Sequence, residues 1–241
     1  MGPFRNSVSM MCADFLDIRS ALDAFARGGV DYLHIDVMDG HYVPNFTLGP
    51  DFCASLSAYS PIPLDIHLMI EDVDAYIPAF SRVPGSLISF HPETCRHPFR
   101  TIDLIRKHNC RPGLALEPGL AIETVKDLLP QVEFVLAMTV SPGYAGQKLI
   151  PGMLGKMATL RETLESAGLD IPIEVDGNVS WENLPAMIRS GGEIFVTGTS
   201  SIFERGTSLE ANLGRLRALF ASLDRPEGRG KPASSGTKAL P

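Results

Sequence analysis

The chain has 241 residues, of which 44% are apolar and 20% charged, and its formal net charge is −7. This length and apolar content suffice for one large α/β domain with a sizeable core. The acidic balance argues against nucleic-acid binding, which needs a basic surface to neutralise phosphates. A small anionic substrate remains compatible with it, because backbone amides and one cation can hold a phosphate locally.

The amino-terminal segment MGPFRNSVSMM lacks an apolar stretch long enough for a signal peptide, and no run reaches the length of a membrane span. The cysteines are scattered without metal-type or disulfide-type spacing, at Cys12, Cys53, Cys95 and Cys110. We therefore expect reduced thiols, a cytoplasmic location and no membrane partner.

Short apolar runs alternate with amphipathic segments along most of the chain. Strands are expected at 8–11, 32–37, 64–70, 87–90, 113–116, 134–140, 171–175 and 194–197. Helices are expected between and after them, among others at 15–27, 99–107, 122–129, 153–166, 183–189 and 209–223. Proline and glycine residues punctuate the joins.

This alternation predicts the class of fold. Strands separated by helices imply right-handed crossovers and parallel pairing. Eight such units favour a single (β/α)8 TIM barrel of the α/β class over residues 1–223. A doubly wound sheet stays open as an alternative, although no GxGxxG turn follows the first strand. Residues 224–241 are rich in Pro, Gly and Ser and are expected to form a disordered tail.

Two neighbouring strand segments carry polar side chains on one face. Alternate residues share a face, which groups His34 with Asp36 and Met38, and Asp65 with His67 and Met69. In a barrel the strand ends meet at the mouth, where Asp176 would join them. His34, Asp36, His67 and Asp176 would then offer two imidazoles and two carboxylates to one divalent ion, Zn, Mn, Co, Fe or Mg.

The alternative is that His34 and His67 are core histidines bonded to Asp36 and Asp65. Burying four such groups without a metal or partner would be costly, so we favour the metal site. Asp36 and Asp176 also lie far apart around the predicted ring. Two carboxylates so placed can take a proton from one face of a carbon atom and return one to the other face. For Asp176, an ordinary Asp-Gly-Asn turn is the competing interpretation.

Two Gly-containing loops, 141–147 and 198–201, are candidates for binding a phosphate group, and the second is expected to open a short helix. With the turn after Asp176, they give the candidate substrate contacts Gly143, Tyr144, Ala145, Gly146, Gly177, Asn178, Gly198, Thr199 and Ser200. Met38, Met69 and Met138 end strands beside the candidate site and would line it, although methionine is more often a core residue.

Three further residues are less clear from the sequence. His91 and Glu93 follow the fourth strand and either reach the mouth or form an ordinary polar loop. Cys12 has no motif that pairs it with a base, so a packed thiol is expected.

Five segments carry a resemblance to a known family. They are SMMCADF (9–15), HIDVMDGHYVPNFTLGP (34–50), DIHLMI (65–70), MTVSPGYAGQ (138–147) and EVDGNV (174–179). Through them the chain resembles the ribulose-phosphate 3-epimerase family over about residues 7–203. The resemblance implies a (β/α)8 barrel that inverts C3 of a phosphorylated ketose with one bound divalent metal.

The resemblance also implies residue roles. His34, Asp36, His67 and Asp176 would bind the metal, Asp36 and Asp176 would be the acid/base pair, and Ser9 and His67 would contact the substrate. The three methionines would line the pocket, and the Gly-containing loops would hold the phosphate. A homo-oligomer is expected.

Within the family, SMMCADF, HPET (91–94), IPIEVDG (171–177) and GTSSIF (198–203) are more similar to D-allulose-6-phosphate 3-epimerases. The expected reaction is therefore D-allulose 6-phosphate to D-fructose 6-phosphate, with D-ribulose 5-phosphate to D-xylulose 5-phosphate as the alternative. A metal-dependent aldolase or hydrolase and a non-catalytic sugar-phosphate binder are more remote. Val8, Glu117 and Asn178 depart from the family pattern, and Glu117 adds an acid after the fifth strand.

Overall fold

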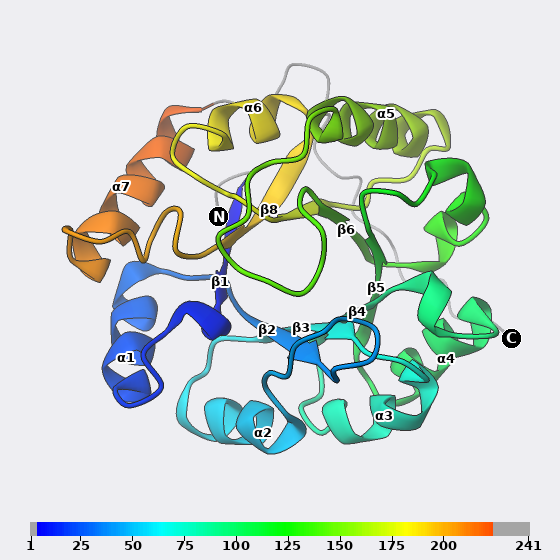
Figure 1. The fold of residues 1–241 in the computed structure, drawn as a ribbon, viewed down its shortest axis with the longest axis horizontal. Helices are drawn as coiled ribbons and strands as arrows, with labels where there is room; N and C mark the ends of the chain where they lie inside the picture. Colours follow the sequence, from blue (N-terminus) through cyan, green and yellow to red (C-terminus); the bar gives the residue numbers. More distant parts are fainter. Residues whose placement is uncertain (1–3, 224–241) are drawn as a thin grey trace, which may run out of the picture.

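The computed structural model describes residues 4–223, which form a closed barrel of eight parallel strands with helices around it (Figure 1). The strands are β1 (Arg5–Ser9), β2 (Tyr32–Met38), β3 (Leu64–Met69), β4 (Leu87–Phe90), β5 (Arg111–Leu116), β6 (Phe134–Met138), β7 (Ile173–Asp176) and β8 (Gly192–Thr197). Because β8 pairs with β1, the predicted TIM barrel is confirmed and the doubly wound sheet is excluded. The expected tail, 224–241, lies outside the described residues.

The outer layer consists of α1 (Ile18–Gly28), α2 (Pro50–Tyr59), α3 (Val73–Phe80), α4 (Pro98–Lys107), α5 (Met153–Ser166), α6 (Leu184–Arg189) and α7 (Leu209–Ser222). The local sequence explains where two of these helices begin or end. Gly29 closes α1 in the left-handed conformation with φ of 68°. The Ser208 hydroxyl caps α7 by accepting a hydrogen bond from the Ala211 amide. None of the helices in residues 4–223 is long and apolar enough to cross a membrane.

Three expected elements differ in the structure. The helix expected at 122–129 is two 3-10 turns, Ile122–Val125 and Leu129–Gln131. Pro130 has no amide hydrogen and cannot donate the bond that would carry an α-helix through its position. The first strand ends at Ser9, and Met10–Cys12 form a 3-10 turn. The expected short helix after β8 is a turn in which the amides of Ser201 and Phe203 both bond to the Gly198 carbonyl.

Alternation along the strands sorts side chains between two environments. In β2, Leu33, Ile35 and Val37 join the core beneath the helices, whereas Tyr32 lies in a separate apolar cluster inside the barrel. The other members of this inner cluster are Leu87, Ala115, Phe134, Leu136, Met138 and Ile194. His34 and Asp36 share the face of Tyr32, so the pleat directs both into the barrel interior.

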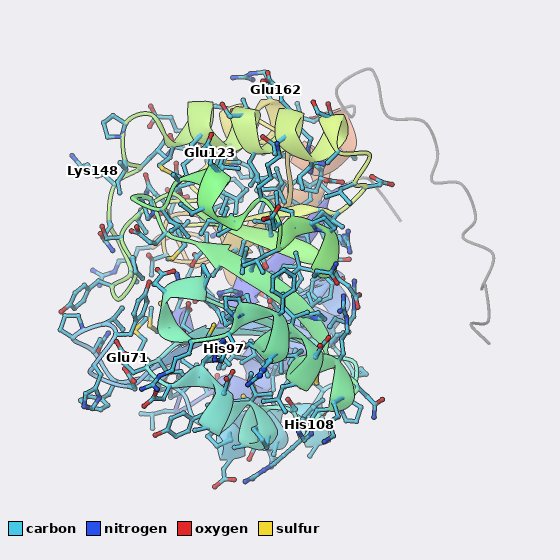
Figure 2. The ribbon with its side chains drawn as sticks, turned by 90° about the vertical axis from the view of Figure 1, so that its right-hand side faces the viewer. Glu71, His97, His108, Glu123, Lys148 and Glu162 are labelled. Carbon is cyan, nitrogen blue, oxygen red and sulfur yellow. The ribbon has the colours of Figure 1, made fainter. Side chains whose placement is uncertain are left out.

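The strand register then fixes which interior groups become neighbours. Asp36 pairs with His67 and Met38 with Met69 across β2 and β3, and Met138 pairs with Asp176 across β6 and β7. Figure 2 views the barrel from the side, with Glu71 and Lys148, which follow β3 and β6, toward one end and His108, which follows α4, toward the other. The interior polar groups therefore lie at the end of the barrel that carries the loops after the strands.

Candidate metal centre and substrate pocket

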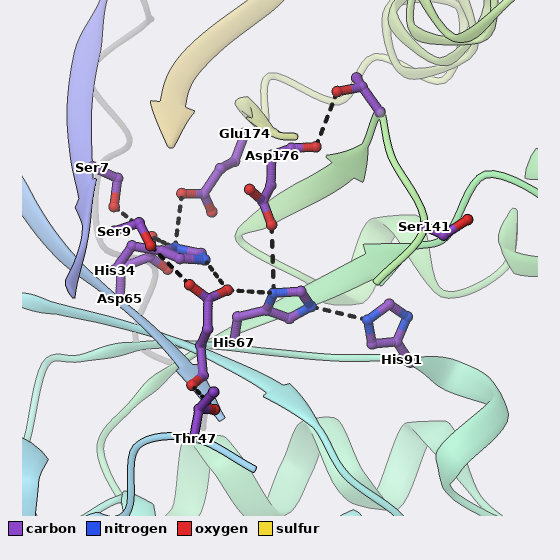
Figure 3. A network of polar contacts seen from close by, with 12 residues as sticks. Ser7, Ser9, His34, Thr47, Asp65, His67, His91, Ser141, Glu174 and Asp176 are labelled. Carbon is purple, nitrogen blue, oxygen red and sulfur yellow. Dashed lines mark hydrogen bonds and ion pairs between the residues drawn. The ribbon is translucent and has the colours of Figure 1, made fainter. Parts of the chain in front are cut away.

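Four side chains from β2, β3 and β7 converge inside the barrel. His34 Nε2 lies 3.4 Å from Asp36 Oδ1, and His67 Nδ1 lies 3.7 Å from Asp36 Oδ1 and 3.8 Å from Asp176 Oδ2. One ligand atom from each of the four lies within 4.8 Å of the others (Figure 3). The structure thus brings together the four residues that the sequence proposed as ligands.

The chemistry of this cluster fits a divalent cation. His34 Nε2 and His67 Nδ1 are buried without a hydrogen-bond partner. A buried unpartnered nitrogen costs free energy, and a cation held between these nitrogens and the carboxylates would satisfy it. Two nitrogen and two carboxylate donors form a set that suits Zn, Mn, Co or Fe.

The two carboxylates differ in their affinity for a proton. Burial opposes ionisation of Asp36, but His34 and His67 hold its pKa well below the usual range. The Ser9 hydroxyl donates a hydrogen bond to Asp36 Oδ2 at 2.9 Å. Burial, together with the charge of Asp36, raises the pKa of Asp176 to about 7. One carboxylate is therefore suited to accept a proton while the other carries one.

A second group of polar side chains lies behind His34. His34 Nδ1 lies 2.7 Å from Asp65 Oδ2, which also accepts a hydrogen bond from Ser7 at 2.6 Å. Glu174 Oε1 is 3.8 Å from His34 Nδ1 (Figure 3). Burial, reinforced by the Asp65 carboxylate, raises the pKa of Glu174 well above its ordinary value. Burial opposes a charge on His34, but Asp65 and Asp36 raise the pKa of His34 well above its ordinary value. In the neutral ring that a metal requires, an Nδ1–H that donates to Asp65 leaves the Nε2 lone pair of His34 directed at the cluster.

His67 has a corresponding partner on its far side. Its Nε2 lies 2.9 Å from Nε2 of His91, which is fully buried just after β4. Burial lowers the pKa of His67 and lowers that of His91 to about 4, so both rings are neutral near pH 7. His91 therefore does not belong to an ordinary polar loop, and it faces the candidate centre through His67.

A pocket opens from the cluster toward solvent. Besides Asp36 and Asp176, its walls contain every predicted substrate contact except His67, which lies beneath them: Ser9, Met38, Met69, Met138, Gly143, Tyr144, Ala145, Gly146, Gly177, Asn178, Gly198, Thr199 and Ser200. The walls also contain residues that the sequence did not single out as contacts: Met11, Cys12, Val140, Ser141, Gln147, Val179 and Val196. Cys12 thus faces the pocket, where burial raises the pKa of its thiol.

The loops after β2 and β6 meet over this pocket. The side-chain amide of Asn45 donates a hydrogen bond to the Gly143 carbonyl at 2.9 Å, and the Tyr144 hydroxyl donates one to the Pro44 carbonyl at 3.1 Å. Gly143 has a φ of 116°, and a Cβ there would lie 3.1 Å from Val43. The glycine permits both the backbone conformation and the close approach of the two loops.

Fold and site define an enzyme-like (β/α)8 barrel whose strand ends carry a His/Asp cluster suited to one divalent ion. Residues 6–203 match the model of the ribulose-phosphate 3-epimerase family. The chain is 42% identical over 200 residues to ribulose-phosphate 3-epimerase 1 of Cupriavidus necator. The aligned residues make up 81% of this chain and 83% of that protein. The chain is also 39% identical over 193 residues to the ribulose-phosphate 3-epimerase of Bacillus subtilis, covering 80% and 89%.

A similar fold occurs in KGPDC from Streptococcus mutans, with a TM-score of 0.66 at 12% identity over 92% of this chain and 99% of that one. At such low identity the likeness concerns the fold alone. The sequence relationships are decisive: this chain belongs to the ribulose-phosphate 3-epimerase family. Membership confirms the expected enzyme class, an isomerase of the epimerase type.

Proposed function

We propose that this chain is a metal-dependent ketose-phosphate 3-epimerase that converts D-ribulose 5-phosphate and D-xylulose 5-phosphate into one another. The observation that carries the proposal is the placement of Asp36 and Asp176. They reach one pocket from β2 and β7 and flank the same imidazole nitrogen, yet burial and charge give them different proton affinities.

These two carboxylates suit an inversion at the carbon next to a ketone. Asp36, ionised at rest, removes the C3 proton from one face and leaves an enediolate. Asp176 in its protonated form delivers a proton to the opposite face of C3, so that one proton leaves and one enters. In the reverse direction the two residues exchange roles. After a turnover the protonation states are reset by solvent through the open pocket.

His34, Asp36, His67 and Asp176 would hold the metal in this proposal. When bound, a divalent ion supplies Lewis-acid stabilisation for negative charge that develops on substrate oxygens. Met38, Met69 and Met138 line the same pocket and are nearly fully buried, so they keep water from the reacting carbon. The Ser9 hydroxyl, bonded to Asp36, holds that carboxylate in position.

The phosphate would bind to the part of the pocket wall that the loops after β6, β7 and β8 form. Gly143–Gly146, Gly177 and Gly198–Ser200 follow β6, β7 and β8, which are adjacent in the barrel. Asn178 has a φ of 45°, and its side chain accepts from the Leu149 amide at 3.1 Å, which ties two of these loops together. Exposed backbone amides in such loops suit a dianionic phosphate.

The choice of substrate departs from our expectation. Short segments such as SMMCADF and GTSSIF favoured D-allulose 6-phosphate, whereas the relatives at 42% and 39% identity are named ribulose-phosphate 3-epimerases. Similarity over about 200 aligned residues weighs more than a few short segments, so we propose the five-carbon substrate. D-Allulose 6-phosphate remains the competing substrate. The cytoplasmic location and the homo-oligomer stay predictions.

A kinetic comparison tests this proposal. Full-length protein reconstituted with Co²⁺, Mn²⁺ or Zn²⁺ is assayed with both ketose phosphates. We expect kcat/KM for D-ribulose 5-phosphate to exceed that for D-allulose 6-phosphate by at least about tenfold. A tenfold ratio corresponds to a difference of roughly 1.4 kcal/mol in the free energy of transition-state binding. A preference for the six-carbon substrate would overturn the substrate assignment. Epimerisation of neither substrate would overturn the function.

A further inference from the structure

A chain of polar contacts runs from His67 away from the pocket. His67 Nε2 lies 2.9 Å from His91 Nε2, and His91 Nδ1 lies 3.5 Å from Glu93 Oε1. The Tyr42 hydroxyl donates to the same Glu93 oxygen at 2.8 Å. The rings of Tyr42 and His91 also pack together, with centroids 4.8 Å apart. The proposed reaction at the opposite face of His67 assigns no role to these three residues.

We propose that His91 and Glu93 are positioning residues that select the tautomer of His67, so that its Nδ1 lone pair faces the candidate metal centre. The proposal rests on the proposed function, in which His67 is a metal ligand. A histidine presents only one lone pair when it is neutral, and the partner of its other nitrogen decides which one.

The first step concerns the two imidazoles. Nitrogens 2.9 Å apart form a hydrogen bond only if one carries a proton and the other offers a lone pair. If His67 Nε2 is the donor, its Nδ1 has a lone pair toward Asp36 and Asp176, where a cation would lie. If His91 Nε2 is the donor instead, His67 presents an N–H to the centre and cannot bind a metal there.

The second step is the choice made at His91. Its Nδ1 is buried, and Glu93 is the carboxylate that faces it. An N–H directed at a carboxylate is favoured electrostatically over a lone pair directed at it. Glu93 therefore favours the proton on His91 Nδ1, which leaves His91 Nε2 as the acceptor for His67. Tyr42 holds the Glu93 oxygen in place from the loop after β2.

The surroundings of these contacts support a proton on Nε2 of His67 and on Nδ1 of His91. His67 and His91 are fully buried, so water does not compete for their nitrogens. The Glu93 side chain is 34% exposed, and although burial opposes its ionisation, its contacts with His91 and Tyr42 lower the pKa of its carboxyl. Carboxylate–imidazole pairs behind a metal ligand orient the ligand ring in this way, and here a second imidazole is inserted between the carboxylate and the ligand.

Nitrogen NMR of ¹⁵N-histidine-labelled, metal-free full-length protein tests the proposal without turnover. We expect His67 of the wild type to carry its proton on Nε2. In His91→Phe the acceptor is lost, and His67 should shift to a mixture of tautomers. His91→Gln keeps an acceptor oxygen and should restore much of the wild-type pattern. His97→Phe, an exposed histidine outside the chain of contacts, is the matched control and should change nothing.

Affinity for Co²⁺ or Zn²⁺, measured by competition with a chelator, is the second readout. We expect His91→Phe to weaken binding about 10- to 100-fold, and Glu93→Gln, which changes a partly exposed side chain and leaves the core intact, to weaken it several-fold. An unchanged His67 tautomer together with metal affinity within twofold of wild type in His91→Phe would overturn the proposal. If neither ketose phosphate were a substrate, the tautomer and affinity results would still decide this question.

Discussion

Asp36 and Asp176 approach the same atom from different sides of the barrel: Asp36 Oδ1 and Asp176 Oδ2 lie 3.7 Å and 3.8 Å from His67 Nδ1. Parallel pairing places His67 beside Asp36, and closure of the barrel brings Asp176 from β7 to the same imidazole. Burial opposes ionisation of Asp36, but its contacts with His34 and His67 hold the pKa of Asp36 well below the usual range, whereas burial and the charge of Asp36 raise the pKa of Asp176. This asymmetry is the basis of the proposed proton transfer.

Replacing either carboxylate by its amide should remove turnover while leaving the fold intact. Asp36→Asn and Asp176→Asn are nearly isosteric, and each removes one proton-transfer group, so we expect kcat to fall by about 10²- to 10⁴-fold. Steady-state kinetics and circular dichroism check this. Asp127→Asn, on the exposed surface, is the control. Wild-type turnover in either site variant would rule out the two-carboxylate scheme.

Metal removal should destabilise the protein as well as inactivate it. A cation that binds only the folded state at 100 times its Kd contributes about 2.7 kcal/mol. For a domain of this size the expected loss of Tm on chelation is therefore roughly 5–10 °C. Thermal unfolding before and after treatment with a chelator measures it, and added Co²⁺ or Zn²⁺ should restore the Tm. A Tm that responds to neither treatment would speak against a resident metal.

The narrow interior of the barrel makes Gly113 sensitive to substitution. A Cβ at Gly113 would lie 2.1 Å from the ring of Phe134, which fills the barrel beneath the site. We expect Gly113→Ala to destabilise the fold by about 1–3 kcal/mol through overpacking. Gly155→Ala in α5, where a Cβ meets nothing within 4 Å, should instead be neutral or stabilising. Urea unfolding compares them; equal effects of the two substitutions would contradict the packing argument.

Asp39 should make the loop after β2 sensitive to acid. Burial opposes its ionisation, but the amides of His41, Glu71 and Tyr42 donate to its carboxylate and hold the pKa of Asp39 below its ordinary value. A depressed carboxyl pKa contributes stability above the unfolded-state value, near 4, and loses it as the pH falls through the folded-state value. The stability difference between wild type and Asp39→Asn should therefore be present at pH 7 and shrink as the pH falls through the folded-state pKa of Asp39. Urea unfolding across this range measures it, and a difference that persists unchanged would refute the assignment.

The sequence predicts those parts of the protein that follow from local periodicity. Alternation in HIDVM and DIHLM places the polar groups in the interior, and α5 has the predicted bounds, Met153–Ser166. The helix expected at 122–129 is instead two 3-10 turns, the second of which contains Pro130.

The supporting groups were harder to predict, because they depend on contacts between distant segments. Ser7 and Glu174 reach Asp65 and His34 only through the closed barrel, although their alternation with Ser9 and Asp176 is a signal that could have suggested an inward face. The position of His91 depends on the turn after β4, which brings it onto His67. The contact of Asn45 with Gly143 likewise depends on how two loops meet.

Epimerisation of D-ribulose 5-phosphate in D₂O, followed by NMR or mass spectrometry of the recovered sugars, tests the central claim most directly. Because the C3 proton passes to one carboxylate and the new proton comes from another that exchanges with solvent, we predict one deuterium at C3 of D-xylulose 5-phosphate and no cleavage of a carbon–carbon bond. Product that retains its original C3 hydrogen, or cleavage of the sugar, would contradict proton transfer between Asp36 and Asp176.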